Sequence, residues 1–339
     1  MLSSVIVARA PGKLVALGEY AVLDGAPALV LALDRYAEAV IGPSPDGRCR
    51  LETLAPAAVE QRFAPGASSG AALVDLVTAA ASPPLAWNAT LDSTAFFAGP
   101  AKLGLGSSAA VLCAWAGAFT AFARSAGRDL AQPGVGALID LHRAFQGGRG
   151  SGLDVAASLT GGAITFSLEP SGVPRIGSVR LPNSVGFAGI FAGRSASTPE
   201  LVAHYRAWRR DRPEQAESHF RRLAAVAESG CAAARGDDAG AFVESLAEYG
   251  RVLQNLGEAI GAEIVTAEHR QIGEHARRYG VAYKVSGAGG GDLGLACAVD
   301  SEALAAFTKS VTDRGFRVIK VSLAEHGLVV EQRVAEGAQ

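Results

Sequence analysis

The chain has 339 residues, of which 49% are apolar, 19% are charged and 6% are aromatic, with 31 lysines and arginines against 33 aspartates and glutamates. Its mean hydropathy of +0.21 excludes a disordered chain. The near balance of charge argues against a nucleic-acid-binding protein that relies on a strongly basic face. A chain of this length is expected to form two domains, or one large one, and is long enough for a buried core.

The first half of the chain is predicted to mix short strands with helices. Apolar, β-branched or alternating residues between turn signals such as Asp24-Gly25 predict the strands. Longer apolar runs, one of them with Ser107 or Ser108 near its start, predict the helices. The expected strands are Val5–Ala8, Ala28–Leu33, Arg50–Leu54, Leu91–Phe97 and Ala163–Leu168, and the expected helices are Ala71–Ala81, Ala109–Ala123, Leu138–Phe145 and Asp154–Leu159.

From about residue 180 the pattern changes. After a buried strand, helical patterns dominate from Thr198 to about Tyr279, beginning with a capping hydroxyl, a proline and an acid. Gly257 and Gly261 are expected to break this helical region. The expected strands are Val185–Phe191, Val281–Val285, Leu293–Val299, Arg317–Leu323 and Gly327–Gln332. Because strands and helices mix without a regular βαβ alternation, we predict the α+β class, with domains at residues 1–180 and 181–339.

The chain is expected to work in the cytoplasm, without membrane contact. Its N-terminal residues carry no basic region ahead of the apolar ones, so no signal peptide is apparent. The longest uncharged stretch, Leu103–Ala123, opens with glycines and serines, and its apolar part from Ala109 is too short to cross a bilayer. The four cysteines lie far apart, which fits a reducing compartment rather than a disulfide or zinc framework.

Glycines and hydroxyls cluster in the segment Lys102-Leu-Gly-Leu-Gly-Ser-Ser-Ala-Ala110. At the start of a helix, such residues bring free backbone N–H groups and the positive end of the helix dipole to one place, which suits a phosphate. The hydroxyls can also ligate Mg²⁺. The alternative is a simple helix cap in a close-packed turn.

Two better-known nucleotide-binding motifs do not explain this segment. It fits the G-x-G-x-x-G/A fingerprint, with Asp129 about 20 residues further on, but a Rossmann loop leaves its strand directly. Here residues 98–102 intervene after Phe97, and no βαβ rhythm follows. No lysine precedes the hydroxyls as it does in a P-loop. A dehydrogenase and an ordinary P-loop NTPase are therefore both disfavoured.

Three further segments become informative in combination. Pro11-Gly-Lys-Leu-Val-Ala-Leu-Gly-Glu-Tyr20 read alone is a turn with a surface cation. Ser286-Gly-Ala-Gly-Gly-Gly-Asp292 lies between apolar strands, where glycines are useful if something bulky approaches the backbone, although a flexible loop is the alternative. Gly150-Ser-Gly-Leu-Asp154 places a carboxylate after a tight turn, either for chemistry or as a helix cap.

In this order, the segments at 11–20, 104–110 and 286–292 resemble the three motifs of the GHMP kinase superfamily, over most of the chain. The chain is most similar to the phosphomevalonate kinases in that superfamily. Tyr20 stands where mevalonate kinases typically have histidine, Lys102 directly precedes the glycines, and Gly193-Arg-Ser-Ala-Ser-Thr198 is similar to a substrate segment. One departure concerns the helix before Asp154, which contains Asp140-Leu-His-Arg143 where mevalonate kinases carry a glutamate. This argues against a second protein carboxylate on the metal.

The resemblance implies an N-terminal ribosomal-protein-type α+β domain, a C-terminal ferredoxin-like domain and an active site in the cleft between them. It implies ATP and Mg²⁺ as cofactors and a small phosphorylated substrate, with phosphoryl transfer to phosphomevalonate in the isoprenoid pathway. No nucleic-acid or membrane partner is expected, and the chain would be a monomer or homodimer.

The resemblance also implies roles for individual residues. Lys13 and Asp154 would be catalytic and lie side by side, and Ser108 would ligate Mg²⁺. The ATP phosphates would be bound by Lys102, Gly104, Leu105, Gly106, Ser107, Ser108 and Ala109. The substrate would be bound by Tyr20, Ser151, Gly152, Ser197, Thr198, Ser286, Gly287, Ala288, Gly289 and Asp292, with Arg149 and Arg194 as candidate cations for its phosphate.

Other functions stay open at this point. A mevalonate kinase, or another GHMP kinase with a hydroxyl acceptor, is the main alternative. A decarboxylase acting on mevalonate diphosphate is disfavoured, because the residues before Asp154 fit kinases better. A catalytically inactive relative is disfavoured by the intact Lys13, Ser108 and Asp154. The six histidines form no spaced ligand set and are interpreted as surface or helix residues, and the basic run Arg206–Arg212 is interpreted as a solvated helix face.

Overall fold

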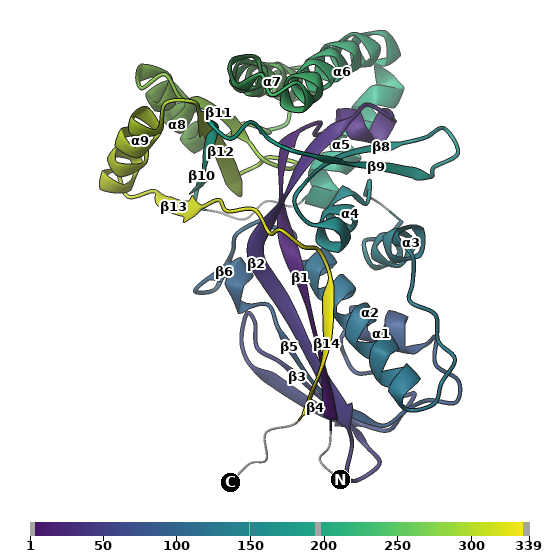
Figure 1. Ribbon diagram of the computed structural model, residues 1–339. Coiled ribbons are helices and arrows are strands. Elements are labelled where there is room, and N and C mark those ends of the chain that lie inside the picture. The colour runs from purple at the N-terminus through teal and green to yellow at the C-terminus, as the bar shows by residue number, and fades with distance from the viewer. Residues whose placement is uncertain (1–3, 149, 194–197, 335–339) are drawn as a thin grey trace.

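The computed structural model describes residues 4–148, 150–193 and 198–334, and it has the mixed α+β architecture expected from the sequence (Figure 1). A large, mostly antiparallel sheet in the order β14-β1-β2-β5-β3-β4 forms the lower part, and the same sheet extends upwards through β8 beside β2 and β9 beside β8. The two longest strands, β1 (Ser4–Leu17) and β2 (Ala28–Pro43), pair along most of their length. The others are β3 (Cys49–Thr53), β4 (Val59–Phe63), β5 (Trp87–Asp92), β8 (Ala163–Leu168), β9 (Pro174–Val179) and β14 (Val329–Val334).

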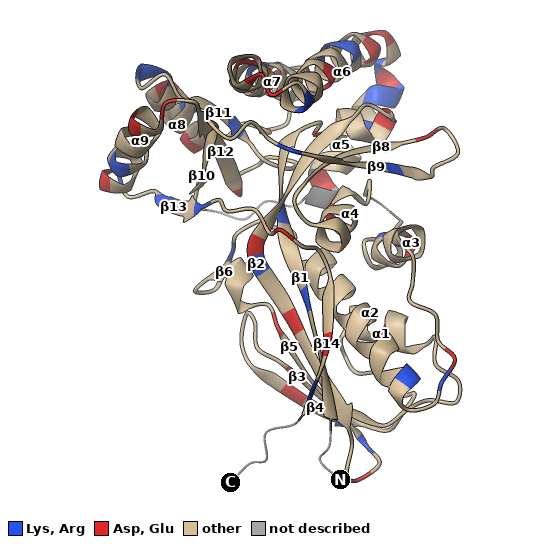
Figure 2. Ribbon diagram, in the orientation of Figure 1, with Lys and Arg blue, Asp and Glu red and all other residues tan. Residues whose placement is uncertain are grey.

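Four helices lie on one side of the large sheet: α1 (Ala72–Thr78), α2 (Ser107–Ser125), α3 (Val135–Phe145) and α4 (Leu153–Thr160). The strands contact α2 and α4, whereas α1 and α3 pack on the other helices. Of these, α2 is the central one, and almost all of its small and apolar residues are buried against β1 and β2. It carries one charged residue, Arg124, in its last turn, so its ribbon is almost entirely tan in Figure 2. The predicted loop followed by a buried helix at Leu103–Ala123 is therefore confirmed.

The upper part has a smaller antiparallel sheet in the order β11-β12-β10-β13, surrounded by helices. Its strands are β10 (Gly186–Phe191), β11 (Ala282–Val285), β12 (Leu293–Ala298) and β13 (Arg317–Lys320). Its helices are α5 (Thr198–Asp211), α6 (Pro213–Arg235), α7 (Ala239–Ile260), α8 (Ala267–Arg278) and α9 (Ser301–Asp313). None of the helices in the described part of the chain combines the length and apolar character that crossing a membrane requires.

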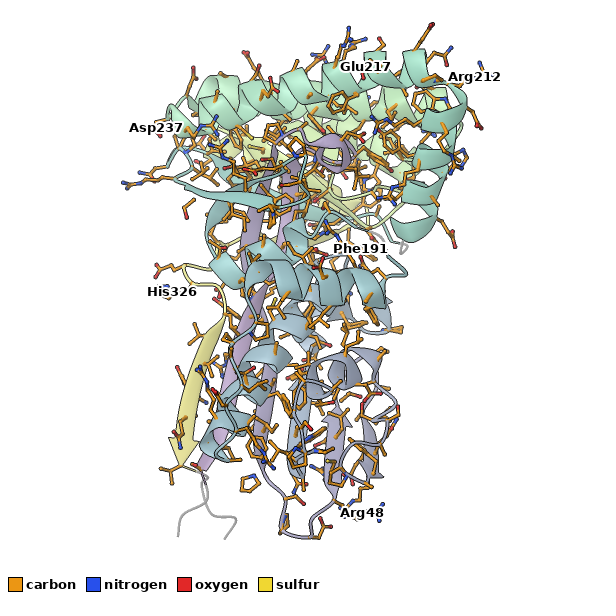
Figure 3. The ribbon with its side chains drawn as sticks, turned by 90° about the vertical axis from the view of Figure 1, so that its right-hand side faces the viewer. Arg48, Phe191, Arg212, Glu217, Asp237 and His326 are labelled. Atoms are coloured by element: carbon orange, nitrogen blue, oxygen red, sulfur yellow. The ribbon has the colours of Figure 1, made fainter. Side chains whose placement is uncertain are left out.

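The two parts share one hydrophobic core. Phe191, at the end of β10, lies where the upper and lower parts meet (Figure 3), and it belongs to the same buried cluster as Leu17 and Leu29 of the large sheet. The C-terminal strand also returns to the large sheet, where β14 pairs antiparallel with β1 and Val334 lies opposite Ser4. The domain boundary proposed at residues 180/181 therefore does not separate the two sheets completely, because β14 of the second half of the chain pairs with β1 of the first half.

Two expectations about local structure were wrong. The strand expected over Leu91–Phe97 ends at Asp92, whose carboxylate accepts a hydrogen bond from the Thr94 N–H (2.8 Å) and turns the chain into a 3₁₀ helix, η2 (Thr94–Phe96). A short hairpin, β6 (Phe97–Ala98) and β7 (Ala101–Lys102), follows. Gly257 does not break a helix: it lies inside α7, where a Cβ would be 2.9 Å from the Ala262 carbonyl oxygen. Gly261 ends that helix in the left-handed conformation, as expected.

Candidate active site

The glycine-rich segments meet around one cavity of about 470 Å³. Predicted site residues from all four segments line it: Lys13, Tyr20, Lys102, Gly104, Gly106, Ser108, Ser151, Asp154, Gly287, Ala288 and Asp292. Val202 of α5 lines it as well. Segments that are far apart in the sequence therefore form a single concave site.

The remaining predicted site residues do not line the cavity, or they lie outside the residues that the structure describes. Leu105, Ser107 and Ala109 are buried within the segment at 102–110, and Gly152, Ser286 and Gly289 are not among the residues that line the cavity. Ser197, Arg149 and Arg194 lie outside the described residues. Thr198 begins α5 as predicted, and its side chain is not described.

The loop before α2 is packed directly on β1. Gly106 caps the helix at φ +78°, and a Cβ at this position would lie 2.9 Å from Cγ of Lys13. The Lys13 N–H donates to the Leu105 carbonyl oxygen at 2.8 Å. Because glycine tolerates this conformation and has no side chain, the lysine stem can lie against the loop. The first turn of α2 thus brings its backbone N–H groups and its dipole to the side of Lys13.

Lys102 and Asp292 bring the second and third motifs together. A Cβ on Gly104 would lie 2.8 Å from the Asp292 carboxylate, so the glycine leaves room for this side chain. Although Lys102 is an exposed residue, partial desolvation lowers the pKa of its ammonium. The charge of Lys13 acts in the same direction, and the Asp292 and Asp154 carboxylates oppose it. The cavity therefore gathers cations close enough to affect one another.

Asp154 is presented by the short helix α4, which starts at Gly152 in the left-handed conformation. Its carboxylate is 20% exposed and accepts a hydrogen bond from the Val155 N–H. The preceding loop is held by the Arg143 guanidinium, which donates to the carbonyl oxygens of Gly150 (3.1 Å) and Ser151 (3.2 Å). A carboxylate with this exposure can reach a ligand in the cavity.

His142 lies directly behind two residues of the cavity wall, although the sequence marks it only as a surface or helix residue. It lies on α3, as a helix residue should, but it is 2% exposed rather than on the surface. Its Nε2 lies 3.0 Å from the Ser108 hydroxyl oxygen, and its Nδ1 lies 3.8 Å from Asp154. One signal in the sequence could have pointed to His142: it stands in the helix segment Asp140-Leu-His-Arg143, where mevalonate kinases carry a glutamate.

The third glycine-rich segment is tied to the first by partly buried polar contacts. The Ser286 hydroxyl accepts from the Val15 N–H (2.9 Å), and the Tyr20 hydroxyl donates to the Ala288 carbonyl oxygen (2.6 Å). Tyr20 itself has φ +62°, an uncommon conformation for a bulky residue. Beneath them, Lys284 and Glu19 form a buried ion pair that the sequence analysis also missed.

The residues at the cavity fit a magnesium ion that takes few of its ligands from the protein. Among the described residues, no group of three or more histidines, cysteines, aspartates or glutamates could hold a metal alone. The Ser108 hydroxyl and the Asp154 carboxylate both line the cavity as oxygen donors. Mg²⁺ prefers oxygen and commonly takes one or two protein ligands, with phosphate oxygens and water completing its shell.

The helix α5 is anchored to the turn that follows the first motif. The Tyr205 hydroxyl of α5 donates to Asp24 at 2.9 Å, and Arg209 forms an ion pair with the same carboxylate. The basic run is therefore not solvated throughout: Arg206 and Arg210 are exposed, whereas Arg209 is paired. These contacts hold Val202 at the wall of the cavity.

Comparisons with known proteins agree with this architecture. The chain is 30% identical over 351 aligned residues to a phosphomevalonate kinase of Streptomyces sp. (strain CL190), covering 88% of this chain and 91% of the relative. It is 29% identical over 235 residues to a mevalonate kinase of Thermococcus gammatolerans, covering 69% and 66%. Its fold resembles that of Streptococcus pneumoniae phosphomevalonate kinase in complex with phosphomevalonate and AMPPNP, with a TM-score of 0.76 at 19% identity over 94% of this chain and 99% of the other.

No family model matches the chain. The identity to the Streptomyces enzyme over nearly the full length of both chains nevertheless establishes the relationship, and the fold comparison supports it. The chain belongs to the GHMP kinase family and is a small-molecule kinase that resembles phosphomevalonate kinase.

Proposed function

We propose that the protein transfers a phosphoryl group from ATP to phosphomevalonate, giving diphosphomevalonate and ADP in the mevalonate pathway. The observation that carries this proposal is the convergence of Lys13, Lys102 and the N-terminus of α2 on one cavity that also holds Asp154. ATP and phosphomevalonate would both place negatively charged phosphate groups in this cavity. The phosphomevalonate kinase relative, which is similar over nearly its whole length, supports the same acceptor.

The cavity residues would act mainly by position and charge. Phosphoryl transfer requires alignment of donor and acceptor and compensation of the charge on the transferred group. The N–H groups at the start of α2 would bind the ATP phosphates, with Lys102 adding a cation. Lys13 would neutralise charge on the transferred group beside Asp154. Ser108 and Asp154 would hold Mg²⁺, which would neutralise part of the phosphate charge.

The chemical nature of the acceptor determines how much Asp154 can contribute to the rate as a general base. A phosphate monoester has its second pKa near 6 and is mostly dianionic at neutral pH. Phosphomevalonate would therefore need little help from a base, and the larger barrier is repulsion between two anions. A hydroxyl acceptor must lose a proton, and a positioned base then contributes about 10²–10⁴-fold. On this proposal, Lys13 contributes more than Asp154.

A mevalonate kinase is the second candidate, because the Thermococcus relative is named as one. Tyr20 argues against it, since mevalonate kinases typically have histidine at this position. Here the Tyr20 hydroxyl is committed to the Ala288 carbonyl oxygen, and burial raises its pKa. It is thus a neutral donor that shapes the cavity wall, rather than a group that can carry charge to the substrate.

ADP release in the presence of ATP and Mg²⁺ tests the proposal directly, with phosphomevalonate, mevalonate, galactose and homoserine as separate acceptors. We expect release with phosphomevalonate, together with a diphosphate product visible by ³¹P NMR. Preferential turnover of mevalonate would establish the second candidate. CO₂ release from mevalonate diphosphate would indicate a decarboxylase, and ligand binding without ADP formation would indicate an inactive relative.

A further inference from the structure

The buried His142 lies between two residues that the proposed function places at the metal. Its Nε2 is 3.0 Å from Oγ of Ser108, and its Nδ1 is 3.8 Å from Oδ1 of Asp154. Both of these partners line the cavity, whereas His142 is 2% exposed and belongs to α3 behind them. His142 thus does not need to touch a ligand in order to affect how Ser108 meets one.

The neighbours of the ring indicate which nitrogen carries the hydrogen. Nδ1 faces the oxygens of the Asp154 carboxyl group, which are hydrogen-bond acceptors, so the ring hydrogen is assigned to Nδ1. In the neutral ring Nε2 is then an acceptor, and the Ser108 hydroxyl donates to it. A serine hydroxyl has one hydrogen and two lone pairs. With its hydrogen directed at His142, Ser108 keeps its lone pairs for a cation in the cavity.

We infer that His142 is a positioning residue, which turns the Ser108 hydroxyl so that its oxygen, and not its hydrogen, faces Mg²⁺ bound with the nucleotide. This inference rests on the proposed ATP and Mg²⁺ use, and it deepens that proposal by naming the group that prepares the metal ligand. It also accounts for a buried histidine on the helix where mevalonate kinases carry a glutamate. His142 acts through Ser108 and has no contact of its own with the ion.

Two variants separate this role from simple packing. An asparagine side chain ends about where Nδ1 lies, so His142→Asn loses the acceptor for Ser108. A glutamine reaches about as far as Nε2, so His142→Gln keeps an acceptor there. His275→Asn is the matched control, because His275 Nε2 makes a similar contact with Ser310 Oγ (2.8 Å) between α8 and α9, away from the cavity.

The measurement is the affinity for ADP by isothermal titration calorimetry, with Mg²⁺ and separately with EDTA. A net hydrogen bond of ordinary strength corresponds to about a 3- to 10-fold change. We expect His142→Asn to weaken binding of ADP with Mg²⁺ by this factor and binding in EDTA by less than about 2-fold. His142→Gln should restore the magnesium-dependent affinity, and His275→Asn should leave it unchanged.

A double mutant tests whether His142 acts through Ser108. In Ser108→Ala/His142→Asn, the loss should equal that of Ser108→Ala alone, because the two residues act as one unit. An unchanged affinity in His142→Asn, an equal loss with and without Mg²⁺, or additive losses would each overturn the inference. If the asparagine variant does not fold, His142→Phe keeps the ring volume and lacks the acceptor. ADP binding needs no acceptor substrate, so these outcomes are independent of the ADP-release screen.

Discussion

Lys284 of β11 forms a buried ion pair with Glu19, the central residue of the Gly-Glu-Tyr sequence in the first motif. The two residues are 265 positions apart in the sequence. The Glu19 carboxylate also accepts from the Gly287 N–H at 3.3 Å. Burial raises the pKa of Glu19 and lowers that of Lys284, and each charge opposes the shift of the other. The pair therefore holds the third glycine-rich segment beside the first.

Removing one partner of this ion pair should destabilise the fold strongly. In Lys284→Met, Glu19 would be left buried without its counter-charge, at a cost of about 3–5 kcal/mol in the free energy of unfolding. The double mutant Glu19→Gln/Lys284→Met should recover most of this loss, because the neutral amide still accepts from Gly287. Urea unfolding followed by circular dichroism measures both. Additive losses in the double mutant would show that the two residues are not coupled.

Lys13→Met should lower kcat more than Asp154→Asn does. With a dianionic acceptor, the cation compensates charge in the transition state, and loss of such a group costs about 10²–10³-fold. The aspartate variant should lose less than Lys13→Met, since little proton transfer is needed and the asparagine side chain keeps an oxygen for Mg²⁺. Steady-state kinetics with phosphomevalonate provides the comparison, and Lys309→Met on the exposed face of α9 is the control. A larger effect at Asp154 would favour a hydroxyl acceptor.

Activity should fall at alkaline pH as Lys102 loses its proton. Desolvation lowers the pKa of this lysine below its ordinary value of 10.5, so its charge is lost at a lower pH than that of a free lysine. Because the protonated form attracts phosphate, kcat/KM for ATP should decline as the pH rises through this lowered pKa. Lys102→Arg should flatten that decline, since a guanidinium stays protonated. An identical alkaline limb in wild type and variant would exclude Lys102 as its source.

Gly106→Ala should reduce phosphate binding by displacing Lys13. Gly127, just beyond the other end of α2, is a matched control because its φ of +77° is nearly that of Gly106 (+78°) and nothing lies within 4 Å of a Cβ there. Both substitutions should cost about 1–2 kcal/mol of backbone strain. Only Gly106→Ala should also raise the Kd for ADP. If both variants bind ADP like wild type, the close approach of Lys13 to this loop is not needed.

Local patterns in the sequence predicted much of the secondary structure, and the exceptions have physical causes. Ala163–Leu168 was predicted with its observed bounds because apolar residues stand between clear turn signals. By contrast, β4 is almost wholly exposed, so its residues Val59–Phe63 show no buried face to detect. The helix α9 was overlooked although Asp300 caps it, accepting from the N–H groups of Glu302 and Ala303. The strand β9 was also missed, because neither of its faces is fully buried and its residues therefore show no continuous apolar pattern.

The sequence by itself determined the turn and helix-start geometry of the glycine-rich segments, because backbone conformation and capping depend on residues within a few positions of one another. It also determined the kinase resemblance, through the order of those segments. Only the tertiary structure decided that His142 lies against Ser108 and Lys284 against Glu19. Such pairs depend on how helices and sheets pack across one shared core, and a side chain acquires its partner there only after distant segments have been brought together.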